Sequence, residues 1–279
     1  MKADLHTHSL ISDGTDTPAE LVQIAHQAGI NTLALTDHDT MAGWEEAQNE
    51  AAKCGITFIP GIEVTSRLGN KSVHVLAYLP DPEHEELHEV LTKMKNSRLH
   101  RARKIVSNLE KDFPDLNWDY IESLYGEQIN HGKSLGKPLI ADAMIQRGYF
   151  PDRTAAFKKV LHSNSPYVIP QEAMTPLAAV KLIRKAHGVP VVAHSRSIER
   201  GEEVPFSYLE QLVDAGMLGI EKDHREHNQE QRMLLEKFAQ KHHLIVTGSS
   251  DYHGKGKPNL IGENTTSEEN IRRILSYQK

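Results

Sequence analysis

Short apolar runs alternate with stretches of helical spacing along most of this chain. In the first third, the apolar runs fall at residues 3–5, 32–36, 56–64 and 73–79. The stretches at 18–29 and 41–55 have helical spacing; the first opens on proline, and both end on glycine, which is typical of helix boundaries. Alternating strands and helices with short connections predict parallel strands joined by crossover helices.

The middle of the chain has a different pattern. Residues 83–113 read as one long amphipathic helix, and strand-like runs are nearly absent from the region that follows it. Shorter helices are predicted at 118–125, 138–148 and 154–162. We therefore expect a helical insertion at 95–170, which forms part of the substrate pocket, and a barrel built from 1–94 and 171–279.

The alternation resumes at Pro176. Strands are predicted at 190–194, 218–221 and 244–250, and helices at 176–188, 206–216, 227–242 and 267–277. The whole chain then contains about seven strand–helix units, and its 279 residues are enough for one α/β barrel with an insertion.

Composition excludes several classes of protein. The net charge of −6 gives no general attraction to nucleic acid, so we expect no stable DNA binding. The longest apolar runs are too short for a membrane helix, and the first ten residues have no secretory pattern, so a cytoplasmic location without membrane contact is expected. The single cysteine, Cys54, excludes disulfide frameworks and multi-cysteine zinc sites.

Histidines and carboxylates follow the predicted strands at the points where those strands end. The candidates are His6, His8, Asp37, His38, Asp39, Glu63, His74, His194, Asp251 and His253. In a parallel barrel the carboxyl ends of all strands meet at one face, where active sites are built. Side chains far apart in sequence should therefore converge there.

These residue types suit divalent metals. Imidazole and carboxylate ligands accept Mn, Fe and Zn alike, so the sequence leaves the metal open. His6 and His8 have the spacing that puts both rings on one side of a strand, and Glu63 could bridge two ions. A lone histidine at a strand end is more often a hydrogen-bonded core residue. The combination favours a metal centre.

Six ordered motifs resemble the PHP family, the polymerase and histidinol phosphatase metallohydrolases. They are HTHSLISDG (6–14), LTDHDT (35–40), PGIEVTS (60–66), VHVLAYL (73–79), VVAHS (191–195) and GSSDYHG (248–254). The insertion segments GKPLIADAMIQRGYF (136–150) and AAFKKVL (155–161) resemble the branch of stand-alone nucleotide phosphoesterases. The resemblance implies a distorted (β/α)7 TIM-like barrel with two or three divalent metal ions.

The resemblance also implies a ligand set. The first ion would be held by His6, His8, Glu63 and Asp251, the second by Glu63, His74 and His194, and the third by Asp13, His38 and His253. Asp13 has an alternative reading as a turn residue. Asp37 and Asp39 would orient imidazoles without binding metal. Glu63, Asp13 and His253 are the expected catalytic residues.

Three residues are expected to contact substrate: Lys137, Arg196 and His227. Lys137 stands where the family commonly has arginine, so it keeps the charge but loses the bidentate fork. His227 is equally compatible with a polar residue at a helix start. Arg98, Arg101 and Lys133 are further cations of the insertion and its flanks, although Arg98 and Arg101 could be solvated.

The predicted activity is metal-dependent hydrolysis of a small phosphomonoester by a hydroxide held between two metals. The resemblance favours a nucleotide as substrate, either a nucleoside 3′,5′-bisphosphate or the 5′ end of a short oligoribonucleotide. A histidinol-phosphate phosphatase and a non-catalytic metal or nucleotide sensor are the alternatives. The sequence leaves the oligomeric state open.

Overall fold

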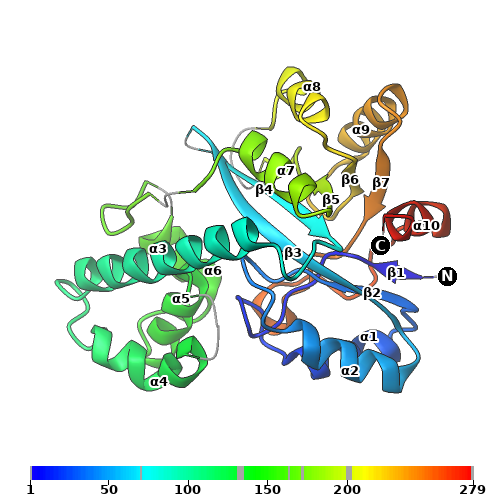
Figure 1. Cartoon of the computed structure of the whole chain (residues 1–279). Helices are drawn as coiled ribbons and strands as arrows, with labels where there is room; N and C mark the ends of the chain where they lie inside the picture. Colours follow the sequence, from blue (N-terminus) through cyan, green and yellow to red (C-terminus); the bar gives the residue numbers. More distant parts are fainter. Residues whose placement is uncertain are drawn as a thin grey trace.

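Seven strands form one sheet in chain order in the computed structural model, which describes residues 2–69, 71–130, 135–162, 164–170, 173–198 and 203–277. The strands are β1 (Ala3–Asp4), β2 (Thr32–Leu35), β3 (Thr57–Leu68), β4 (Lys71–Tyr78), β5 (Val189–Val192), β6 (Gly219–Asp223) and β7 (Ile245–Gly248). A parallel bridge between Thr7 and Tyr252 joins the segments that follow β1 and β7. The sheet is thereby nearly closed, and the expected TIM-like barrel is confirmed (Figure 1).

Ten α-helices surround or flank this sheet within the described residues. They are α1 (Pro18–Gln27), α2 (Trp44–Cys54), α3 (Glu85–Leu109), α4 (Trp118–Asn130), α5 (Lys137–Gln146), α6 (Arg153–Ala156), α7 (Pro176–Lys185), α8 (Phe206–Asp214), α9 (Gln229–Lys241) and α10 (Glu268–Leu275). A π-helical turn, Phe157–Leu161, continues α6, and a 3-10 turn, Gly254–Gly256, follows β7. None of the described helices is long and apolar enough to cross a lipid bilayer.

The expectation that all strands are parallel is wrong for β4. β4 pairs antiparallel with both β3 and β5, and β3 and β4 form a hairpin in which Thr65 lies opposite His74. The chain between these strands is too short for a crossover, which needs a dozen or more residues. Because β4 runs in the reverse direction, its early residue His74 still lies at the end of the barrel where the parallel strands finish.

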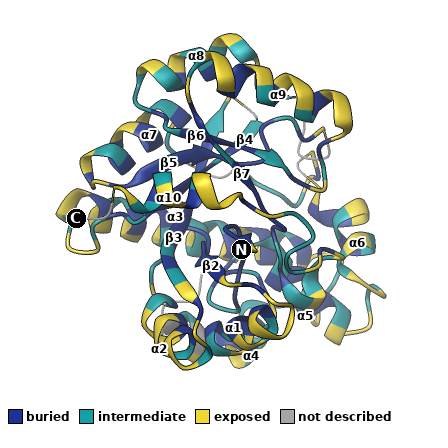
Figure 2. Ribbon diagram, turned by 90° about the vertical axis from the view of Figure 1, so that its right-hand side faces the viewer, coloured by how far each residue is buried: buried dark blue, intermediate teal, exposed yellow. Residues whose placement is uncertain are grey.

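The barrel interior is filled by alternate strand residues. Leu5, Leu76, Tyr78 and Val191 belong to one buried cluster, to which α10 adds Ile271 and Ile274. Figure 2 shows the strands as a buried centre, with exposed residues on the outer sides of the surrounding helices. This packing gives the strand ends a rigid base.

The helices α3 to α6 build a second apolar core beside the barrel (Figure 1). The helix α3 belongs to both parts. Leu87, Leu91 and Met94 pack in a cluster with residues of β3, β4 and α7, whereas Ala102 and residues after it pack against α4 and α5. The packing therefore changes between Met94 and Ala102. The insertion boundaries at 95 and 170 remain predictions, and residue 171, like Lys133, lies outside the described residues.

Candidate metal centre

The structure brings all nine predicted metal ligands together at one end of the barrel. Glu63 of β3 lies at their centre, and its two carboxylate oxygens face different histidines. Oε2 lies 3.2 Å from Nε2 of His6, 3.0 Å from Nε2 of His8 and 3.3 Å from Nδ1 of His38. Oε1 lies 2.6 Å from Nδ1 of His74 and 3.0 Å from Nε2 of His194. One carboxylate can therefore serve two neighbouring ions.

The first group of possible ligands is fully buried. It consists of His6, His8, Glu63 and Asp251. Oδ1 of Asp251 lies 3.6 Å from Nε2 of His6 and 3.4 Å from Nε2 of His8. These separations fit ligands that share an ion at about 2.1 Å from each.

A second group lies across Glu63. His38, Glu63 and His74 offer atoms close enough for one ion, and His194 approaches the same Glu63 oxygen as His74. The backbone of His194 has a φ of 29°, and that of Asp251 a φ of 53°. Residues other than glycine rarely adopt such angles, so the surrounding packing holds the backbone of these two residues in an uncommon conformation, as often occurs at functional sites.

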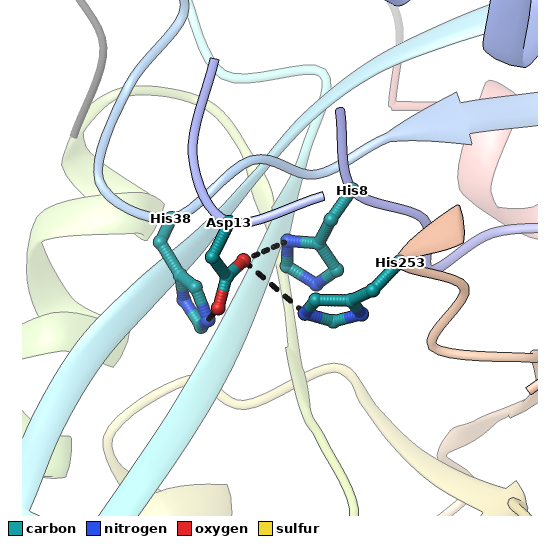
Figure 3. A group of neighbouring side chains, drawn as sticks. All are labelled: His8, Asp13, His38 and His253. Atoms are coloured by element: carbon teal, nitrogen blue, oxygen red, sulfur yellow. Dashed lines mark ion pairs between the residues drawn. The ribbon is translucent and has the colours of Figure 1, made fainter. Parts of the chain in front are cut away.

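The third group forms around Asp13 (Figure 3). It contains His8, Asp13, His38 and His253. Oδ1 of Asp13 lies 3.2 Å from Nε2 of His253 and 3.8 Å from Nδ1 of His8, and Oδ2 lies 3.8 Å from Nε2 of His38. Asp13 faces this cluster, which favours the ligand interpretation over that of a turn residue.

Unpartnered buried atoms supply a test of metal binding. Five buried ligand atoms have no hydrogen-bond partner among the described residues: Nε2 of His6, Nε2 of His8, Nδ1 of His38, Oε2 of Glu63 and Nε2 of His253. An unsatisfied buried polar atom is costly, and here such atoms point at one another. Divalent ions would satisfy them, so the residues fit the metals that the sequence suggests.

The ligands differ in their protonation states. Against the effect of burial, Glu63, Glu221 and Asp251 hold the pKa of His6 well above its usual range, and hydrogen bonds to Asp251 and Glu63 raise the pKa of His8 to about 9. Both imidazoles would therefore release a proton when an ion binds.

Burial raises the pKa of Glu63, but His38, His74 and His6 outweigh it and hold that pKa well below its usual range. Burial, together with Lys257 and His8, lowers the pKa of His253 to about 4. Glu63 is therefore ionised and His253 neutral at neutral pH, which are the forms that bind metal.

Comparison with known proteins assigns the fold to a family. The PHP domain matches residues 4–175. The chain belongs to the PHP family. A crystal structure from Bifidobacterium adolescentis, described provisionally as a metal-dependent phosphoesterase, superposes with a TM-score of 0.94 at 36% identity and covers 99% of this chain and 96% of its own.

Two curated relatives of this PHP protein are named as enzymes of nucleotide chemistry. The 5′-3′ exoribonuclease of Haemophilus influenzae is 29% identical over 90% of both chains. The 3',5'-nucleoside bisphosphate phosphatase of Chromobacterium violaceum is 29% identical over 91% of this chain and 88% of its own. With the site described above, these findings show that the protein is a metal-dependent phosphoesterase.

The sequence analysis did not identify Glu221 and His224 as residues of this centre. Glu221, in the middle of β6, accepts a hydrogen bond from Nδ1 of His6 at 3.1 Å and another from the amide of His194 at 2.8 Å. Nε2 of the buried His224 lies 3.6 Å from Asp251. Glu221 ends the run LGIE as Glu63 ends GIE, so its position at the end of a predicted strand was the available indication.

Among the described residues, neither Asp37 nor Asp39 bonds directly to an imidazole, which corrects the expectation; Asp37 reaches His8 only through the hydroxyl of Ser12, 3.4 Å from Nδ1 of His8. Asp37 accepts hydrogen bonds from Ser9 and Ser12 and so fixes the loop that carries Asp13. Asp39 accepts from the amide of Thr65 at 2.7 Å and from Nε of Arg98 at 2.8 Å. Asp37 thus holds the loop after β1 in place, and Asp39 joins β3 to the helix α3 beside the ligands.

Among the cations of the insertion, Arg98 contacts residues that adjoin the ligands, whereas Arg101 and Lys137 bond to carbonyls of the insertion itself. Arg98 is partly buried and donates to Asp39 and to the hydroxyl of Thr65, so it is not a solvated charge. Nε of Arg101 donates to the carbonyl of Ile169 at 2.8 Å. Nζ of Lys137 donates to the carbonyl of Leu161 at 2.9 Å and lies over the ring of Phe157.

The other two predicted substrate residues make contacts within the protein. Arg196 forms an ion pair with Glu203, donates to the carbonyl of Val204 and stacks over Phe206. Nδ1 of His227 donates to the carbonyl of Lys222 at 2.8 Å, and its Nε2 accepts from the amide of Arg196 at 3.2 Å. Both ring nitrogens of His227 are thus used to fix the loop after β6.

Proposed function

We propose that this PHP protein removes a phosphate from a nucleotide, with nucleoside 3′,5′-bisphosphates and the 5′ ends of short oligoribonucleotides as its substrate class. The names of the two relatives from Haemophilus influenzae and Chromobacterium violaceum support this class. Both kinds of substrate carry a second phosphate at a short distance from the one that reacts.

A cluster of cations beside the metal groups carries the proposal. The basic surface consists of Arg67, Arg98, Arg101 and Lys137. Arg98 reaches it from α3, where its guanidinium contacts Asp39 and Thr65, and Thr65 pairs with the ligand His74 across β3 and β4. Two phosphates on one substrate could therefore contact the metal groups and the basic surface together.

These cations repel one another in a partly buried setting. Burial, with Arg101 and Arg67, lowers the pKa of Lys137 to about 8. Burial, with Arg98 and Arg67, lowers the pKa of Arg101 to about 10. A bound phosphate would offset this repulsion and accept charge-assisted hydrogen bonds, which gives the surface a preference for dianionic groups.

Each proposed catalytic residue has a distinct task. Divalent ions, when bound, would activate water and neutralise charge on the phosphoryl group. Glu63 spans the first two groups and fixes their separation. Asp13 and His253, whose Oδ1 and Nε2 lie 3.2 Å apart, are the residues we propose to hold an ion that would neutralise charge on the leaving oxygen. Lys137 and Arg98 would orient the second phosphate.

The histidinol-phosphate alternative is less compatible with this surface. That substrate has one phosphate and a body that carries an amine and an imidazole. Cations of the substrate would approach cations of the protein, which costs binding energy. A non-catalytic sensor would not need the complete set of ligands that converges here.

Steady-state kinetics in Mn²⁺ would test the proposal. The substrates are adenosine 3′,5′-bisphosphate, 3′-AMP, 5′-AMP, a 5′-phosphorylated trinucleotide, histidinol phosphate and p-nitrophenyl phosphate. We expect kcat/KM for the bisphosphate or trinucleotide to exceed that for each monophosphate by about ten- to a hundredfold, the value of one or two charge-assisted hydrogen bonds. Equal values for all nucleotides, or a preference for histidinol phosphate, would contradict it.

A further inference from the structure

One arginine of the insertion reaches the third ligand group from outside it. Arg153 opens α6, whose first turn is capped by Asp152. Its Nε and Nη2 donate to the two oxygens of Asp142 on α5, at 2.6 and 2.7 Å. This bidentate pair fixes the plane of the guanidinium, and the side chain of Arg153 is only 16% exposed.

The remaining nitrogen of that guanidinium points toward the loops that follow β1 and β7. Nη1 of Arg153 donates to the carbonyl of Asp13 at 3.2 Å. It also packs against Gly256, where an added methyl group would lie 2.2 Å from Nη1. Gly256 belongs to the turn after β7, and its amide bonds to the carbonyl of His253. The guanidinium therefore lies between the loops that supply Asp13 and His253.

These two loops also hold each other. The amide of Lys255 donates to the hydroxyl of Thr15 at 2.9 Å, and the hydroxyl of Tyr252 donates to Asp16 at 3.0 Å. The distances between the ligands of the third group thus depend on the relative position of these two loops. Arg153 contacts both loops from α6, which packs in the second apolar core. A small movement of either loop would change the distance between Asp13 and His253.

We propose that Arg153 is a positioning residue that couples the helical insertion to the third metal group and sets the affinity of that group for its ion. The inference rests on the proposed function only in taking this group to hold an ion. Asp142 orients Arg153, and Arg153 fixes the carbonyl of Asp13 against the turn at Gly256. Displacing the guanidinium should weaken the third ion and leave the first two groups unchanged.

The test is to titrate Mn²⁺ into metal-free protein. Calorimetry and the electron paramagnetic resonance signal of free Mn²⁺ both measure the binding. D13N identifies the third ion as the one that it weakens. We expect R153M to raise the Kd of this ion about ten- to a hundredfold, as loss of an outer partner of a ligand typically does. R153K keeps the charge but not the fork and should give a smaller increase.

Two further variants separate positioning from stability. G256A should displace the guanidinium while keeping Arg153, and so reproduce the effect of R153M. R147M removes another arginine of the insertion, which stacks on Tyr120, and should leave all Mn²⁺ affinities unchanged. In metal-free R153M, amide hydrogens of residues 12–14 should exchange faster than in the wild type, whereas α5 should stay protected.

The outcomes distinguish the two levels of inference. If D13N weakens one ion while R153M and G256A bind Mn²⁺ as the wild type does, the role of Arg153 is wrong and the metal centre stands. If D13N leaves every affinity unchanged, the third group holds no ion, and both this part of the proposed centre and the inference are overturned. Equal weakening of all ions in R153M would indicate a general loss of structure and would also overturn the inference.

Discussion

Nδ1 of His6 donates to Oε1 of Glu221 at 3.1 Å, and both side chains are fully buried. This bond leaves Nε2 of His6 as the nitrogen that faces Glu63 and Asp251. A carboxylate behind a ligand imidazole selects its tautomer and raises its basicity. The orientation of His6 therefore depends on a residue of β6 that lies 215 positions later in the sequence.

The first prediction concerns that pair. E221Q should weaken metal binding at the first group about ten- to a hundredfold, because an amide is a weaker acceptor than a carboxylate and can rotate its NH₂ toward His6. Competition of the protein with a chelator for Mn²⁺ measures the change. E230Q, in the exposed first turn of α9, is the matched control and should bind as the wild type does. Equal affinity in E221Q would show that Glu221 does not tune His6.

The second prediction concerns the shared carboxylate. E63Q should reduce kcat by at least about a thousandfold, because a neutral amide bridges two cations poorly and both neighbouring groups use Glu63. H253A should retain more metal, since the first two groups keep their ligands. Metal content and kcat of both variants give the comparison. Near-normal turnover in a fully metallated E63Q would show that the carboxylate does not bridge.

The third prediction follows from the position of Lys137. K137A should lower kcat/KM for the preferred nucleotide about ten- to a hundredfold, the value of one charge-assisted hydrogen bond, and that for p-nitrophenyl phosphate by less. Kinetics on both substrates gives the ratio. An equal loss on both, or no loss on either, would exclude Lys137 as the residue that selects nucleotides.

A pH dependence accompanies this role. The pKa of Lys137 is lowered to about 8, so its cation is present below that pH and lost as the pH rises through it. KM for the nucleotide should therefore rise between pH 7 and pH 9 in the wild type. K137M has no such cation and should lack this rise, while changes caused by the metal centre remain. A rise of the same size in K137M would assign the titration to another group.

The last prediction concerns metal removal. The protein should bind more than one divalent ion per chain, because its ligands exceed what one tetrahedral site can use. Exhaustive chelation should abolish hydrolysis and lower Tm, since each ion at a hundredfold excess over its Kd stabilises the fold by about 3 kcal/mol. Elemental analysis and calorimetry before and after adding Mn²⁺ measure both effects. Full activity in metal-free protein would contradict the function.

The structure differs from the sequence interpretation where a contact depends on direction or distance. The sequence pattern predicts two parallel strands where the structure has the β3–β4 hairpin, because β3 extends to Leu68 and β4 begins at Lys71, beyond the apolar runs on which the prediction depends. Arg98 could not be distinguished from a solvated charge, since helical spacing alone does not show that it reaches Asp39. His227 was equally ambiguous, and its ring nitrogens contact backbone atoms, which no side-chain pattern reveals.

The sequence by itself indicated the barrel, the helical middle region and the histidines and carboxylates at predicted strand ends, because strand and helix periodicity, chain length and residue type are local properties. The set of nine candidate ligands, with Asp13 among them, followed from the resemblance to the PHP family. Only the tertiary structure decided which oxygen of Glu63 faces which histidine, that Glu221 fixes His6, and that Arg153 joins the insertion to the loops of Asp13 and His253. These relationships join residues up to 215 positions apart, such as His6 and Glu221, and depend on how packed helices and strands fix side-chain directions in space.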